Sequence, residues 1–156
     1  MVELLNNIFN IIINVNFYVP IIICLLLVIA GQFLKPIYGK MKNVLFTFQG
    51  IIVDWWSISH IILYIYFGYK FPNSFAEFLI IGSIWEVIEA FLCRENFEKI
   101  TQCRDSENIV CRNMRKFNSC DYWYGRIDDV AMNMIGFTIG AAIHKTTHKN
   151  QSHITV

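Results

Sequence analysis

The chain has 156 residues, of which 55% are hydrophobic and 16% are charged, and its net charge at pH 7 is +1. Soluble proteins carry roughly 25% charged residues, so this balance favours helices packed in lipid over a soluble domain. The length leaves room for one compact domain, residues 1–156. The near-neutral charge argues against a nucleic-acid partner, since proteins that bind nucleic acids usually carry a strong basic excess.

Asparagines recur every three or four residues near the N-terminus, at Asn6, Asn7, Asn10 and Asn14. On a helix this spacing produces a neutral polar stripe opposite an apolar face. The pattern predicts a helix over residues 3–16 that lies along the membrane interface. The alternative is that these residues are the polar-striped beginning of the first membrane span.

Four apolar stretches follow, each near the length of about 20 residues that a membrane span needs. They are residues 17–34, 49–69, 75–93 and 126–143. We therefore expect an all-α, polytopic transmembrane helical bundle of about four spans. Residues 94–125 form a polar loop that contains cysteines, and residues 144–156 form a polar tail.

Basic residues indicate the orientation of these spans. Ten lysines and arginines lie in or beside the first loop and the long loop, against three on the opposite side. Loops rich in lysine and arginine normally stay in the cytoplasm. We therefore expect a multi-pass integral membrane protein whose loop 94–125 is cytoplasmic.

The cysteines of the long loop point the other way. Cys93, Cys103, Cys111 and Cys120 would form two disulfides in an oxidising compartment, with three possible pairings. In the cytoplasm the same thiols would be free or bound to a metal. A loop on the oxidising side would invert the whole topology, and both alternatives stay open.

Ionisable residues interrupt the last three spans, where a charge costs several kcal/mol at bilayer depth. Counted at 1.5 Å per residue, all of them fall in one half of the membrane, roughly 3 to 16 Å from its surface. Such residues normally face a partner, a cavity or a substrate. The residues are Asp54, His60, Glu86, Glu89, Asp128 and Asp129.

Two kinds of site would use these groups. Carboxylates with one imidazole suit a divalent ion such as Mg²⁺, Mn²⁺ or Zn²⁺, and the candidate ligands are His60, Glu86, Glu89 and Asp129. Without a metal, closely spaced carboxylates favour acid–base chemistry. In either case we expect Glu86, Glu89 and His60 to be catalytic, with Asp54, Asp129 and Asn133 as binding residues.

Simpler interpretations accompany each feature. The carboxylates could be paired with Arg94 or Arg126 as structural contacts, and His60 could be a hydrogen-bonded packing residue. Gly136 and Gly140 form a GxxxG pattern, which lets another helix approach closely, either in the same chain or in a second copy of a homo-oligomer.

At these polar residues the chain resembles the VanZ-like group of small multi-pass membrane proteins, and it is similar to an uncharacterised bacterial branch of that group. The matching stretches, within about residues 50–142, are Asp54–Ile62, Trp85–Glu89, Tyr122–Gly125 and Asp129–Gly136. The resemblance implies a polytopic helical fold, with Asp54, His60, Glu86, Glu89, Asp129 and Asn133 at the polar positions that recur in the family. It implies no defined activity.

Three functions are compatible with this sequence. The first is an enzyme or binding protein for a lipid or lipid-linked headgroup, because a shallow polar site is easily reached by such an amphipathic ligand. The second is a structural or assembly membrane protein whose acids and GxxxG face hold a helix bundle or oligomer together. The third is a small proton-coupled transporter, which the clustering of the acids in one leaflet disfavours.

Overall fold

The computed structural model describes residues 2–33, 43–48, 51–93, 109 and 125–152. These residues form five helices and one β-hairpin, which confirms the helical fold class. The elements are α1 (Val2–Ile12), α2 (Val15–Phe33), β1 (Phe46–Phe48), β2 (Ile51–Val53), α4 (Trp55–Lys70), α5 (Phe75–Leu92) and α8 (Ile127–Ser152). Nearly all of the predicted loop 94–125 lies outside the described residues.

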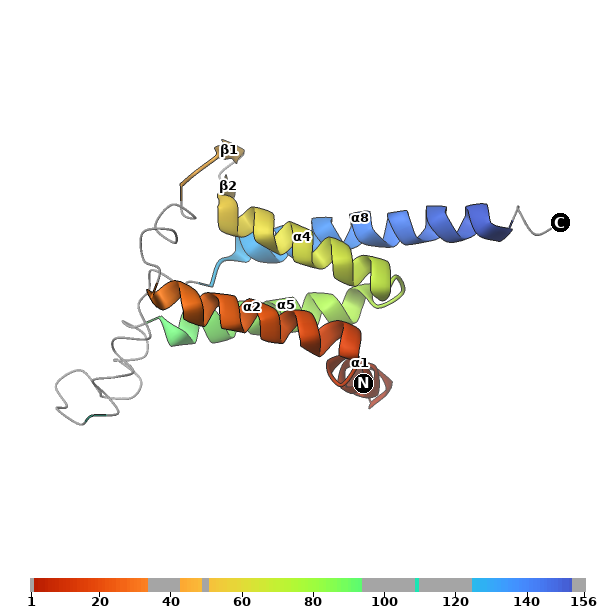
Figure 1. Ribbon diagram of the computed structural model, residues 1–156, viewed down its shortest axis with the longest axis horizontal. Helices are drawn as coiled ribbons and strands as arrows, with labels where there is room; N and C mark the ends of the chain where they lie inside the picture. Colours follow the sequence, from red (N-terminus) through yellow and green to blue (C-terminus); the bar gives the residue numbers. More distant parts are fainter. Residues whose placement is uncertain (1, 34–42, 49–50, 94–108, 110–124, 153–156) are drawn as a thin grey trace.

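The long helices alternate in direction (Figure 1). Helices α4 and α8 pack side by side and both begin at the end of the bundle that carries the β-hairpin. Helix α5 runs in the opposite direction and packs against α8, while α2 contacts α4. The C-terminal end of α5 and the N-terminal ends of α4 and α8 therefore meet at one end of the bundle. This agrees with the prediction that the polar residues of these three segments lie on one side.

Glycines bring α4 and α8 into backbone contact. A Cβ atom on Gly136 would collide with the carbonyl oxygen of Ile61, and one on Gly140 with the carbonyl oxygen of Ile65. Gly68 of α4 meets the backbone of α8 in the same way. The GxxxG pattern is therefore a packing contact within the chain, and its use between two copies stays a prediction.

An aromatic core fills the far end of the bundle, away from the hairpin. Phe78 of α5 is fully buried, with its ring centroid 5.0 Å from that of Phe67 and 5.1 Å from that of Phe137. Phe17 of α2 stacks on Phe67 at 5.3 Å. These rings join α2, α4, α5 and α8 through apolar burial. The aromatic core therefore holds the four helices together at the end opposite to the polar residues.

The helix of the predicted second span begins later than expected. Residues 49–69 were predicted as one helical span, but Ile51–Val53 pair with Phe46–Phe48 in an antiparallel hairpin, and α4 starts at Trp55. Asp54 follows the strand in an extended conformation, and its carboxylate accepts a hydrogen bond from the amide of Ser57. This capping box fixes the start of the helix, and β-branched residues favour the strand before it.

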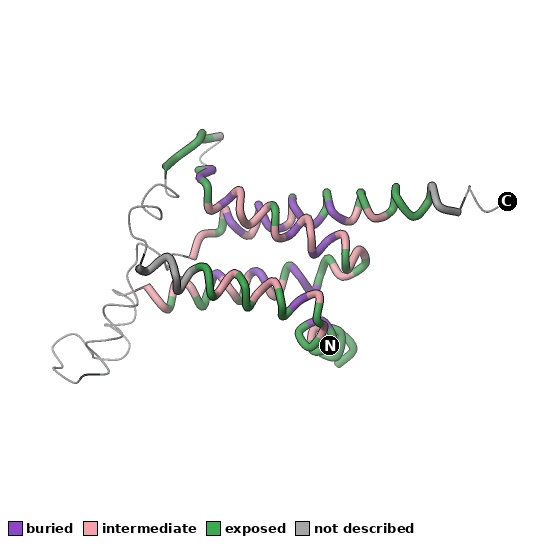
Figure 2. Tube along the Cα trace, in the orientation of Figure 1, coloured by how far each residue is buried: buried purple, intermediate pink, exposed green. Residues whose placement is uncertain are grey.

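Two further boundaries differ from the prediction. The expected helix over 3–16 ends at Ile12, and Asn14 accepts a hydrogen bond from the amide of Asn16 at the beginning of α2. Asparagine competes in this way with helical backbone bonds. The predicted tail is helical as far as Ser152, and its exposed turns extend beyond the end of α4 (Figure 2).

Among the described residues, no helix on its own combines the length and the apolar character that crossing a bilayer requires. Val2–Ile12 and Val15–Leu27 meet both requirements when taken together, with a bend of 62° between them. The bundle of four spans therefore stays a prediction.

Candidate functional site

Three of the predicted site residues converge at the hairpin end of the bundle. His60 of α4, Glu86 of α5 and Asp129 of α8 each offer one ligand atom, and these atoms lie within 4.8 Å of one another. We call these residues the His60 group. Both carboxylates are buried. Three helices far apart in the sequence thus present two acids and one imidazole to a single point.

Asn133 sets the orientation of the imidazole. It is almost completely buried, and its Oδ1 lies 3.0 Å from Nδ1 of His60. When Nδ1 carries the ring proton, it donates to this oxygen and leaves Nε2 with a free lone pair. An oxygen acceptor on one nitrogen is the usual partner of a histidine that binds a metal through the other. Asn133 therefore acts as a positioning residue.

Glu86 has one bonded and one unbonded oxygen. Its Oε2 accepts a hydrogen bond of 2.9 Å from the backbone amide of Arg126. Its Oε1 is buried, lies 4.0 Å from Nδ1 of His60, and has no hydrogen-bond partner among the described residues. A buried acceptor without a partner costs about 1–3 kcal/mol. Oε1 is therefore the atom at which a bound ion or ligand would gain the most.

Arg126 holds two other acids beside this group. Its guanidinium donates to Asp128 Oδ2 at 2.6 Å, to Asp54 Oδ2 at 3.4 Å and to the carbonyl oxygen of Ile52 at 3.1 Å. These bonds connect the hairpin, the start of α4 and the start of α8. They support the structural interpretation for Asp54 and Asp128, whereas Asp54 had been expected to be a binding residue.

Ser57 links the two sets of acids. Its hydroxyl lies 3.1 Å from Asp54 Oδ1 and 3.1 Å from Asp129 Oδ1, and its single O–H can donate to one of them at a time. Ser57 was not among the predicted site residues. A polar residue three positions after an N-cap aspartate, before an apolar run, is the signal that could have identified it.

Gly82 makes room for the inner wall of the site. A Cβ atom at this position would lie 2.8 Å from the hydroxyl of Tyr64 and 3.2 Å from Nδ2 of Asn133. The missing side chain at residue 82 therefore leaves the space that the side chains of Tyr64 and Asn133 occupy. A single glycine inside an apolar stretch gives no signal in the sequence that distinguishes this role.

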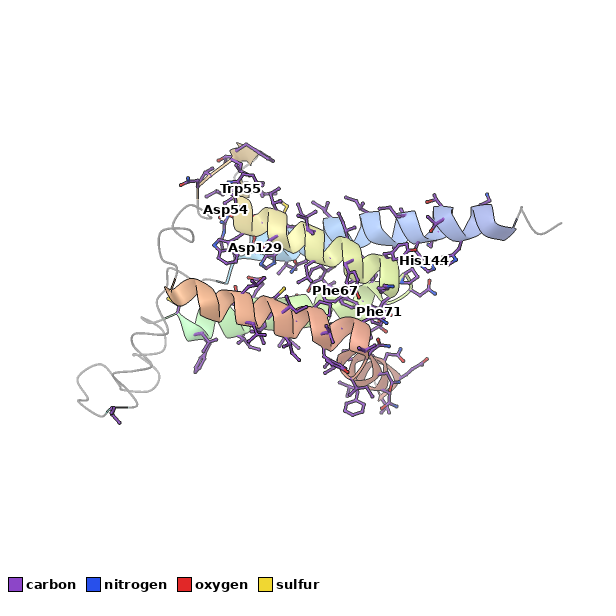
Figure 3. The ribbon with its side chains drawn as sticks, in the orientation of Figure 1. Asp54, Trp55, Phe67, Phe71, Asp129 and His144 are labelled. Atoms are coloured by element: carbon purple, nitrogen blue, oxygen red, sulfur yellow. The ribbon has the colours of Figure 1, made fainter. Side chains whose placement is uncertain are left out.

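Glu89 does not belong to the His60 group. Its half-buried side chain accepts a hydrogen bond from Trp85, one turn earlier on α5. Both Glu86 and Glu89 were predicted to lie at the site, and only Glu86 contributes to the His60 group. Figure 3 shows Asp54 and Asp129 at the hairpin end of α4 and α8, far from Phe67 and Phe71.

The cysteines are only partly described. Cys93 takes part in a disulfide, and Cys24 of α2 is free. Cys103, Cys111 and Cys120 lie outside the described residues, so the pairing stays a prediction.

In comparisons with known proteins, no family model matches this chain, and neither a curated protein nor a solved structure matches it significantly. The resemblance to the VanZ-like group therefore stays a prediction, and the functional argument depends on the geometry of the site.

Proposed function

We propose that this protein is an integral membrane protein that binds a divalent cation through the His60 group and presents it to the headgroup of a lipid or lipid-linked molecule. The observation that carries the proposal is the convergence of His60, Glu86 and Asp129, together with the buried Oε1 of Glu86 that lacks a hydrogen-bond partner.

The geometry is close to that of a bound ion. Metal–ligand bonds of about 2.0–2.2 Å allow two ligand atoms on one ion to be at most about 4.4 Å apart. The ligand atoms of the His60 group span 4.8 Å or less, so modest side-chain rotations would complete the site. Two carboxylates and an imidazole suit Mn²⁺, Mg²⁺ or Zn²⁺.

Electrostatics also favour a cation. The site brings two buried carboxylates together, and the guanidinium of Arg126 is already bonded to Asp54 and Asp128. A divalent ion would offset the repulsion between Glu86 and Asp129. Three protein ligands leave further coordination positions for water or for a phosphate oxygen of a ligand.

The surface of the bundle supports a lipid environment. On α2, Ile22, Ile23, Leu26 and Leu27 expose half or more of their surface, and Val87 on α5 is 69% exposed. Contiguous apolar surface of this kind marks contact with a membrane or a partner. The three helix ends at the site place its ligands near one end of this apolar surface, where a headgroup would lie.

The test is Mn²⁺ binding to the full chain in detergent, followed by the electron paramagnetic resonance signal of free Mn²⁺. We expect one ion per chain, and Glu86→Gln should weaken binding by more than the roughly 10–100-fold that loss of an outer-sphere partner causes. Glu77→Gln is the matched control, because it makes the same change in a buried glutamate of α5 that bonds to Asn7 instead. Equal Mn²⁺ affinity in both variants would refute the site.

Contact between the bound ion and a lipid headgroup is tested by a separate measurement. With the protein in bicelles, bound Mn²⁺ should broaden the ³¹P signal of a phospholipid added in small amount. The Glu86→Gln variant should lose this broadening, and Glu77→Gln should keep it. Mn²⁺ binding without any effect on the ³¹P signal would retain the metal site and refute the lipid ligand.

A structural role is the second candidate, and the bonds of Arg126 favour it. These bonds join the hairpin to the beginnings of α4 and α8. If the polar residues have only this role, Glu86→Gln should lower the unfolding temperature. Neither the variant nor the unmodified protein should then bind the ion.

A further inference from the structure

Two histidines lie one turn apart near the C-terminal end of α8. The ring centroids of His144 and His148 are 4.2 Å apart, and the ring of Tyr69 packs edge-on against His144 at 5.5 Å. His144 lies at the end of the bundle opposite to Asp54 and Asp129 (Figure 3). The pair is therefore separate from the His60 group.

One nitrogen of this pair is buried without a partner. Nδ1 of His144 is inaccessible to solvent and has no hydrogen-bond partner in the described part of the chain. His148 is exposed. A buried polar atom in this state gains from any ligand that it can reach, and the neighbouring imidazole supplies a second nitrogen for the same ligand.

We propose that His144 and His148 together bind a divalent transition-metal ion of the Zn²⁺, Ni²⁺ or Cu²⁺ class, as a second site that is independent of the His60 group. Histidines at positions i and i+4 share one face of a helix, and two histidines in this arrangement are metal ligands in helical zinc motifs. Imidazole nitrogens select these ions over Mg²⁺ and Ca²⁺. No acidic residue follows Asp129 in α8, so carboxylate ligands from this helix are excluded.

Binding has a mechanical consequence. The last turns of α8 extend beyond α4 (Figure 1), so little tertiary packing holds them. An ion bridging residues 144 and 148 would cross-link one turn and would stabilise this extension by linkage.

The test uses the full chain with a histidine-free tag in a Glu86→Gln background, so that a failure at this site is distinct from a failure at the His60 group. Zn²⁺ affinity is measured by competition with a chromophoric chelator. Because two linked ligands bind far more tightly than one, His148→Gln should weaken Zn²⁺ binding by roughly 10²-fold. The exposed position of His148 means that this variant should fold.

Two controls distinguish binding that requires the pair His144 and His148 from binding by any exposed histidine. The combination His148→Gln with Asn150→His keeps the number of histidines but places the second one on another face of the helix, and it should not restore binding. His153→Gln should bind Zn²⁺ like the parent. Hydrogen exchange in residues 141–152 should slow on addition of Zn²⁺ in the parent and not in His148→Gln.

Three results would overturn the proposal. One is a parent that does not bind Zn²⁺ at all. Another is undiminished binding by His148→Gln. The third is full restoration by the combined variant, since the spacing of one helical turn would then be irrelevant.

Discussion

Replacing Gly136 with alanine tests whether backbone contact between α4 and α8 builds the ligand site. A Cβ atom at this position would lie 3.0 Å from Cα and 3.1 Å from the carbonyl carbon of Ile61. The carbonyl oxygen of Ile61 would be closer still. Favourable carbon–carbon contacts are about 3.5–4.0 Å, so the two backbones must separate by at least about 0.5 Å. None of these atoms belongs to a flexible side chain that could move aside.

This separation has two calculable effects. Overpacking costs about 1–3 kcal/mol, and the better helix propensity of alanine returns about 1 kcal/mol, so we expect a loss of up to about 2 kcal/mol in the free energy of unfolding. The hydrogen bond between His60 and Asn133, one turn away, is 3.0 Å long. An extra 0.5 Å would take it beyond the usual limit of about 3.2 Å, so the affinity for Mn²⁺ should fall about tenfold or more.

The assay combines denaturant unfolding in detergent, followed by circular dichroism, with Mn²⁺ titration. Thr138→Ala is the control, because Thr138 is exposed on the same helix between the two glycines. It should change stability by less than about 0.5 kcal/mol and leave the Mn²⁺ affinity unchanged. A Gly136→Ala variant that is as stable as the parent and binds Mn²⁺ equally well would refute the link between helix contact and site geometry.

The remaining predictions concern stability, measured by the same unfolding assay. Phe78→Ala should cost about 3–5 kcal/mol, because the ring is fully buried in the aromatic core; a loss below 1 kcal/mol would contradict this packing. Arg126→Gln removes the guanidinium opposite the buried Asp54 and should cost up to about 3–5 kcal/mol, while adding Asp54→Asn should recover much of the loss, because asparagine still caps the helix. Asn7→Ala removes the hydrogen bond to Glu77 and should cost about 1 kcal/mol; an unchanged free energy of unfolding would show that this bond does not hold α1 on α5.

Helix rotation explains why the sequence did not divide the acids correctly. Asp54 and His60 are six positions apart, so as members of one helix they could not point to the same place. Asp54 lies outside the helix as its N-cap and bonds to Ser57 and Arg126, which leaves His60 alone to reach Glu86 and Asn133. The cap signal was present in the sequence, but its effect on the helix boundary depends on the hairpin that precedes it.

The asparagine stripe shows a related difference. Its periodicity predicted an interfacial helix, and α1 is helical, yet Asn7 bonds to the buried Glu77 of α5, and Asn14 accepts a hydrogen bond from Asn16 at the beginning of α2. Spacing alone reports that polar residues share a face. It cannot report whether that face meets water, lipid or a carboxylate that is 70 positions away in the chain.

The sequence by itself determined the helical class, the order of the helices and the fact that ionisable residues on three of them lie at one end of the bundle. Hydrophobic periodicity and residue spacing are local properties, and they are sufficient for these conclusions. Only the tertiary structure decided which acids meet. The glycine contacts fix the rotation of α4 and α8 against each other, and the packing of α5 on α8 adds the third helix. In this arrangement Asp128 bonds to Arg126 and Glu89 to Trp85, while Glu86 and Asp129 meet the imidazole of His60.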